Sequence, residues 1–285
     1  MLTTSRAAAL AAIVLATSLA AACGSDAPRT GPRPAAFREN ITTWSRPLDA
    51  YSLPDTTVQY AQSLVYAACM RKAGHRITVV DPAEYVPANV TKQGYKVFDL
   101  DIAQNYGYHN APTRSTPLGA QPGEDTPEAG RCTTTANKAI ANPYADFVQN
   151  LRAAAYESSL HASAVGVAAR RWHDCMLPLG LADLPGSPAD MPTLRLAKQW
   201  GLSGPSDPAA DTVAAPTRPT VPEIRVATAD ARCRESSRYT ATLYRAQVSA
   251  QQQLVDRNDD KLAAAYAASR AQSAAVARTL QRYGR

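Results

Sequence analysis

The residues of this sequence with the most chemical potential are its five cysteines. Cys23 stands near the N-terminus, after an apolar stretch, whereas Cys69, Cys132, Cys175 and Cys233 are spread over the rest of the chain. A thiol can carry a lipid, form a disulfide, bind a metal ion or act as a nucleophile. The neighbours and the spacing of each cysteine decide among these chemistries.

The residues before Cys23 have the order of an export signal. Arg6 supplies a positive charge, residues 7–16 form a short apolar run, and alanines lead directly into the cysteine. The run is too short for a membrane-spanning helix, which needs about 20 apolar residues. This arrangement resembles the lipobox of bacterial lipoproteins, although Ala20 stands where leucine is usual. We therefore predict a signal peptide over residues 1–22 and a lipid on Cys23; the alternative is a secretory signal followed by an unmodified cysteine.

The predicted lipid would hold the protein on the outer face of the cytoplasmic membrane. Residues 23–55 are rich in proline and show no sustained hydrophobic period, which predicts a flexible tether. The net charge of +6 is mild for 285 residues and no block of Lys or Arg occurs, so we expect no nucleic-acid partner. The expected partners are the membrane, through the lipid, and an envelope protein or cell-wall polymer.

Beyond residue 55 the chain shows two copies of one plan, over residues 56–174 and 175–285. Each copy has a Cys-Met pair, a glycine five residues after the cysteine, a short helix-like segment ending in aromatic-Gly, a proline-rich loop and an Arg-Cys pair. The landmarks are Cys69, Gly74, Tyr106-Gly107 and Cys132 in the first copy, and Cys175, Gly180, Trp200-Gly201 and Cys233 in the second. The period is far longer than that of solenoid repeats, which indicates a two-copy duplication.

The duplication also selects a disulfide pattern. Four cysteines allow three pairings, and export favours their oxidation. If each copy began as a unit that folded alone, the bridges are Cys69–Cys132 and Cys175–Cys233. Closing a loop of about 60 residues contributes about 4 kcal/mol in the chain-entropy model. Each bridge would join the end of one helix to the start of the next long helix. A structural zinc site would instead need cysteines a few residues apart, which this sequence lacks.

Hydrophobic periodicity predicts a mainly α fold, made of two duplicated helical units with proline-rich loops. We expect a helix over residues 56–72, one continuous helix over 144–176, and helix over 234–282 with a break at 256–260. Residues 76–80 are a short edge strand or an extended loop. The chain has only 3 Phe and 3 Trp, so the disulfides would supply stability that the core lacks.

Motifs for catalysis or metal binding are missing from the sequence. The segment from Gly201 to Pro205 nearly matches a serine nucleophile elbow around Ser203, but proline replaces the last glycine. His161 and His173 are more than three turns apart on one predicted helix, so they cannot share a metal ion. Residues 256–260 lack the glycine and the glutamate of a calcium loop. We predict no catalytic residue, no metal and no cofactor, and hence a protein that is not an enzyme.

An aromatic cluster is the remaining candidate for a ligand site. Tyr95, Tyr106, Tyr108 and His109 lie close together in the sequence, near Phe98. They could form a stacking platform for a sugar or a peptide; the alternative is that the tyrosine rings pack in the core while their hydroxyls reach water. A tryptophan at the Tyr106 position of the second copy favours packing.

The pattern Cys69-Met70-Arg71-x-x-Gly74, followed by Tyr106-Gly107-Tyr108-His109 and a later Arg-Cys, resembles secreted lipoproteins of actinobacteria. The resemblance covers about residues 60–180, and the second copy departs from it, with Leu202-Ser203 at the Tyr108-His109 position. It implies an extracytoplasmic location but no activity. We therefore expect a non-enzymatic binding or scaffolding module at the cell envelope. The alternative is a cell-wall or carbohydrate hydrolase, which would need a pocket holding two acidic groups about 5 to 10 Å apart.

Overall fold

The fold is mainly α-helical, which confirms the predicted class. The computed structural model describes residues 32–91, 93–113, 126–202 and 218–284, and no β-strand occurs within these ranges. Residues 76–80 are an extended loop. The α-helices are α1 (Asp55–Lys72), α2 (Pro82–Tyr85), α3 (Leu100–Tyr106), α4 (Pro127–Ala139), α5 (Ala145–Leu160), α6 (Ser163–Met176), α7 (Leu194–Gln199), α8 (Val221–Ser236), α9 (Tyr239–Arg257) and α10 (Asp259–Tyr283). Short 3-10 turns are η1 (Pro47–Tyr51), η2 (Leu177–Leu179) and η3 (Pro188–Asp190).

The two predicted disulfides are present, and each ties two helices together. Cys69–Cys132 joins α1 to α4 with Cα atoms 5.5 Å apart, and Cys175–Cys233 joins α6 to α8 with Cα atoms 5.7 Å apart. The prediction that each bridge reaches the start of the second helix is wrong, because α4 already begins at Pro127 and α8 at Val221. The prolines at these starts open the helices, since proline fits the first turn, where its missing N–H is not needed.

The long helices are interrupted where the backbone finds other partners. The predicted continuous helix over 144–176 is two helices, α5 and α6, which meet at an extended Ala162. Near this break the Ser159 hydroxyl donates to the Tyr156 carbonyl oxygen, a local bond of the kind that competes with helical hydrogen bonding. The predicted break at 256–260 is confirmed, because α9 ends and α10 begins at Asn258. A further break, which the sequence did not predict, lies at Arg238, where φ is +58°.

The glycines at matching positions of the two predicted copies also share a backbone feature, a positive φ angle. The glycine after each Cys-Met pair and the glycine after each aromatic residue all have positive φ; they are Gly74, Gly107, Gly180 and Gly201. In each copy a disulfide joins the helix before these glycines to the helix after them. The two predicted copies therefore share the sign of φ at these glycines and the helices that the disulfides join.

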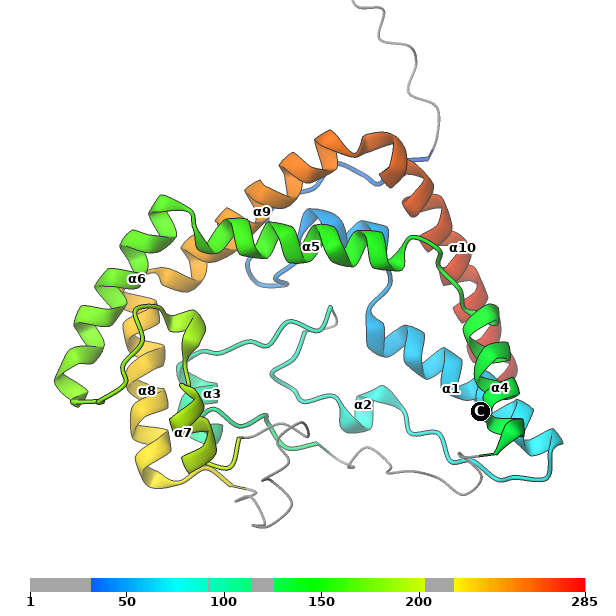
Figure 1. Cartoon of the computed structure of the whole chain (residues 1–285), viewed down its shortest axis with the longest axis horizontal. Helices are drawn as coiled ribbons and strands as arrows, with labels where there is room; N and C mark the ends of the chain where they lie inside the picture. The colour runs from blue at the N-terminus through cyan, green and yellow to red at the C-terminus, as the bar shows by residue number, and fades with distance from the viewer. Residues whose placement is uncertain (1–31, 92, 114–125, 203–217, 285) are drawn as a thin grey trace, which may run out of the picture. The chain divides into compact units, whose positions relative to one another are not determined.

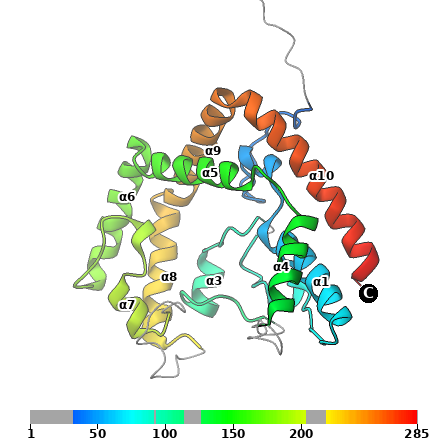
Figure 2. The same cartoon turned by 45° about the vertical axis from the view of Figure 1, so that its right-hand side comes forward.

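Packing between the helices crosses the boundary between the copies (Figures 1 and 2). Helix α1 packs on α4 and on α10, whereas α6 packs on α8 and α9, and α5 lies along α9. The short helix α3 belongs to the first copy but packs on α8 of the second. The largest core cluster forms there, around Trp172, Met176, Leu196 and Trp200. The described residues from 32 onward belong to one compact unit.

The segment before α1 differs from the flexible tether predicted over residues 23–55. In its described part Leu48 is fully buried and Tyr51 nearly so, packed against Val148 of α5 and Leu262 of α10. The Leu48 N–H donates to Gln251 of α9 at 2.9 Å. Pro47 of this segment opens the 3-10 turn η1. None of the helices in the described ranges carries an apolar stretch long enough to cross a bilayer.

Candidate functional site

Tyr108, one of the predicted platform residues, lies in the core. Its ring stacks between Phe98, at 5.3 Å between centroids, and Trp200, at 5.5 Å. Its hydroxyl donates to the fully buried carboxylate of Asp230 at 2.9 Å. Burial, and next the charge of Asp230, raise the pKa of Tyr108 far above its usual value. The Tyr108 ring therefore packs in the core, as the alternative interpretation of the sequence proposed, but its hydroxyl meets a buried carboxylate instead of water.

His109 and Gly107 fasten α3 to α8 through one buried carboxylate. Glu223 is fully buried, and its Oε1 lies 2.9 Å from His109 Nδ1 and accepts the Tyr108 N–H at 2.9 Å. The chain approaches so closely that a Cβ on Gly107 would lie 2.4 Å from that oxygen. Lys96 donates to the Tyr108 carbonyl oxygen at 2.8 Å, and burial lowers the pKa of its ammonium group. The Tyr-Gly-Tyr-His motif is thus a structural clamp between the copies.

The predicted platform residues do not form one surface. Tyr106 is half-buried at the end of α3, whereas Tyr95 lies in a different place, next to η1. The Tyr95 hydroxyl donates to Asp49 Oδ1 at 2.7 Å, and the Arg46 guanidinium covers its ring at 3.5 Å from the centroid. Burial, followed by the charge of Asp49, raises the pKa of Tyr95. Of the four residues, Tyr95 leads to a cavity.

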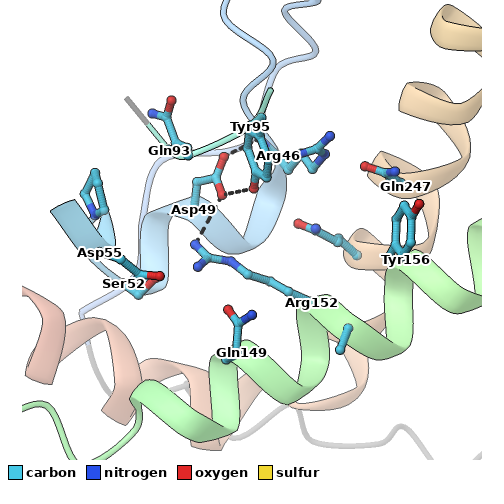
Figure 3. A pocket seen from close by; sticks show the side chains of 14 residues that line it. Arg46, Asp49, Ser52, Asp55, Gln93, Tyr95, Gln149, Arg152, Tyr156 and Gln247 are labelled. Atoms are coloured by element: carbon cyan, nitrogen blue, oxygen red, sulfur yellow. Dashed lines mark hydrogen bonds and ion pairs between the residues drawn. The ribbon is translucent and has the colours of Figure 1, made fainter. Parts of the chain in front are cut away.

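That cavity, which we call the arginine pocket, has a volume of about 470 Å³ (Figure 3). This is within the range of small-ligand sites, about 300 to 1,000 Å³. Its walls come from η1, the start of α1, the loop before Tyr95, α5 and α9. The residues that carry its polar chemistry are Arg46, Asp49, Ser52, Asp55, Gln93, Tyr95, Gln149, Arg152, Tyr156, Gln247 and Gln251.

A network centred on Asp49 forms one side of the arginine pocket (Figure 3). Asp49 Oδ1 accepts from the Tyr95 hydroxyl and from Arg152 at 3.2 Å, while Oδ2 accepts the Arg46 backbone N–H at 2.8 Å. The Arg152 side chain is 21% exposed and that of Asp49 10%, so this ion pair is partly shielded from water. The network holds both guanidinium groups in place beside the cavity.

Three polar atoms around the arginine pocket are buried without a hydrogen-bond partner among the described residues. They are Arg46 Nε, Arg152 Nε and Ser52 Oγ. The amide of Gln247, a residue only 6% exposed, also makes no hydrogen bond to the described part of the chain. A buried donor left unpaired costs about 1–3 kcal/mol. A polar occupant that supplies acceptors would recover this cost, which is typical of a ligand site.

Two carboxyl groups, Asp49 and Asp55, line the arginine pocket, so the hydrolase alternative has a concrete candidate pair. Both oxygens of Asp49 already accept hydrogen bonds from three protein donors. Asp55 is exposed at the first position of α1. Three of about four acceptor sites of the Asp49 carboxylate are therefore taken by protein donors, which makes it a weaker base towards water and favours binding over hydrolysis.

The remaining predicted site residues add no second centre. Cys69, Cys132, Cys175 and Cys233 are consumed by the disulfides. Cys23 and Ser203 lie outside the described residues. Among the residues that are described, no three His, Cys, Asp or Glu side chains gather closely enough to hold a metal ion.

Sequence reasoning missed Arg46, Asp49 and Arg152. The first two stand in the segment assigned to a tether, and the third is about 100 residues away in an alanine-rich helix. No spacing signal joins them. Comparison of the chain with protein-family models, with curated proteins and with solved structures finds no match.

Proposed function

We propose that this protein is a membrane-anchored lipoprotein of the cell envelope that binds a small hydroxyl-rich ligand, such as a saccharide unit of a cell-wall polymer. The observation that carries the proposal is the arginine pocket, where two guanidinium groups, a hydroxyl and several amides converge on one cavity. Amide and guanidinium groups supply the donors, and amides also the acceptors, that sugar hydroxyls require. The export signal and Cys23 motif support the location.

The chemistry of the pocket supports binding without turnover. Its carboxylate with the best geometry, Asp49, has both oxygens engaged with protein donors. Tyr156, which is 40% exposed, offers an aromatic face beside the polar groups, as sugar sites often do. The proposal is therefore a non-enzymatic receptor or scaffold.

Binding is tested by titrating purified wall-glycan fragments into the protein with Cys23→Ser, followed by calorimetry and ligand-observed NMR. The pocket variant Gln247→Leu removes an amide that makes no hydrogen bond to the residues that the structure describes. The matched control is Gln253→Leu, the same change at an exposed position of the same helix α9. Saturable binding that Gln247→Leu weakens at least fivefold, and that Gln253→Leu leaves unchanged, would support the proposal.

Two outcomes would contradict it. Glycan binding that survives Gln247→Leu would place the ligand elsewhere, and release of new reducing ends from the glycan would establish the hydrolase alternative. The anchor is tested separately by growing cells with a labelled fatty acid. Label is expected in the wild-type protein and not in Cys23→Ser; a labelled Cys23→Ser variant, or an unlabelled wild type, would refute lipidation at Cys23.

A further inference from the structure

The charges around the arginine pocket do not balance. Arg152 is paired with Asp49 at 3.2 Å. Arg46, in contrast, forms no ion pair with any carboxylate in the described part of the chain; its guanidinium carbon lies over the Tyr95 ring, 3.5 Å from the centroid. A cation–π contact leaves the full positive charge in place. The buried side of the pocket therefore carries one excess positive charge.

Asp55 does not remove this excess. It is exposed, and it occupies the first position of the 18-residue helix α1. A helix N-terminus carries about half a positive charge, which a carboxylate at that position offsets. Solvent screens an exposed charge far more than a shielded one. The charge of Asp55 is therefore partly offset by its own helix end and screened by water, and no carboxylate of the described residues forms an ion pair with Arg46.

From this imbalance we propose that the occupant of the arginine pocket is an anionic saccharide, one that carries a single carboxylate or phosphate group. The inference rests on the proposed function and adds the charge of the ligand. A guanidinium edge binds planar carboxylates and phosphates by paired N–H donors, and the buried, unpartnered Nε atoms of Arg46 and Arg152 are donors of this kind. The Ser52 hydroxyl, also unpartnered and buried, adds a third donor.

The two halves of such a ligand match the two sides of the pocket (Figure 3). Arg46, Asp49 and Arg152 form the charged side, with Gln149 beside Arg152, and Tyr156 and Gln247 provide an aromatic face and an amide for a sugar ring. A volume of about 470 Å³ accommodates one or two sugar rings. A carboxylate and a phosphate share the chemistry that this site requires, and the experiment separates them.

Three matched probes test the inference by calorimetry and NMR titration on the full chain carrying Cys23→Ser. They are N-acetylglucosamine, its carboxylate-bearing ether N-acetylmuramic acid, and N-acetylglucosamine 6-phosphate. We expect at least one anionic probe to bind ten or more times tighter than the neutral sugar. The anionic probe with the higher affinity shows whether the ligand of the pocket carries a carboxylate or a phosphate. Raising the salt concentration from 20 to 500 mM should reduce that preference several-fold.

The variant Arg46→Gln tests the role of Arg46: it should reduce the anion preference, measured as the ratio of the affinities for the anionic and the neutral probe, to less than threefold. Arg245→Gln, an exposed arginine on α9 outside the pocket, is the matched control and should keep the full preference. Equal binding of all three probes would overturn the inference while leaving the proposed function intact. Failure of all three to bind would count against the proposed function itself. A preference that Arg46→Gln leaves unchanged would also overturn the inference.

Discussion

The peptide at Gly107 makes the contact between the two copies unusually sensitive to a single methyl group. Gly107 has φ +57° and ψ −128°, a conformation that essentially only glycine adopts. A Cβ there would lie 2.4 Å from Glu223 Oε1 and 2.9 Å from Cδ of the same side chain. Glu223 is fully buried, and its carboxylate can move away only by weakening its hydrogen bonds with the Tyr108 N–H and His109. We therefore expect Gly107→Ala to strain the backbone and displace the carboxylate that clamps α3 to α8.

The loss of free energy of unfolding in Gly107→Ala is the sum of the backbone strain and the weakened hydrogen bonds of Glu223. A residue forced into this backbone region costs about 1–3 kcal/mol. Displacing Glu223 weakens its hydrogen bonds with the Tyr108 N–H and His109 Nδ1, both 2.9 Å long, and a bond to a charged group is worth about 1.5–3 kcal/mol. With one such bond lost, the free energy of unfolding should fall by about 4 kcal/mol.

Gly180→Ala is the matched control for this prediction. Gly180 has φ +64° and ψ +30°, the ordinary left-handed region, and a Cβ there would meet nothing within 4 Å. That substitution should cost only about 1 kcal/mol. Urea unfolding followed by tryptophan fluorescence reports on the affected core, because Trp172 and Trp200 both lie in it. Equal losses for the two variants would refute the argument, as would a Glu223→Ala background in which Gly107→Ala costs just as much.

Three further outcomes are expected. Replacing Cys175 and Cys233 together by alanine should lower the free energy of unfolding by about 4 kcal/mol, because their loop spans 58 residues; a loss below 1 kcal/mol would argue against the entropic account. Burial raises the pKa of Tyr108, so the folded state keeps a proton that the unfolded state loses above about pH 10; stability should therefore fall as pH rises from 10 to 12, and Tyr108→Phe should make that fall shallower in pH-dependent urea unfolding. Leu48→Ala should cost about 2–5 kcal/mol by thermal unfolding, because Leu48 is fully buried, whereas a flexible tether would lose almost nothing.

The disulfides and the helical class could be predicted because both depend on patterns within the chain. The landmark order Cys69, Gly74, Gly107 and Cys132 recurs in the second copy, and that recurrence selected one pairing among three. The helix starts were predicted less well. Prolines at the beginning of α4 and α8 were assigned to loops, although proline at the first turn is compatible with either state.

The arginine pocket could not be predicted, because its charged residues share no local pattern. Arg46 and Asp49 lie in a proline-rich segment whose burial depends on Leu48 and Tyr51 meeting helices about 100 and 200 residues away. Arg152 stands in the alanine-rich helix α5, and nothing in the sequence around it indicates a binding site. Their proximity is a tertiary property, whereas the apparent cluster of Tyr95, Tyr108 and His109 was divided between two places by the same folding.

The position of α3 on α8 has a consequence for how the two halves fold. The second half contains two fully buried acidic groups, Glu223 and Asp230, whose partners include Tyr108 and His109 from the first half. Without the first half, Glu223 and Asp230 would lose the partners and the cover that α3 and Trp172 provide, and Asp230 would keep only its ion pair with Arg234. The two halves are therefore parts of one compact unit, and we expect neither to keep its native packing when expressed alone.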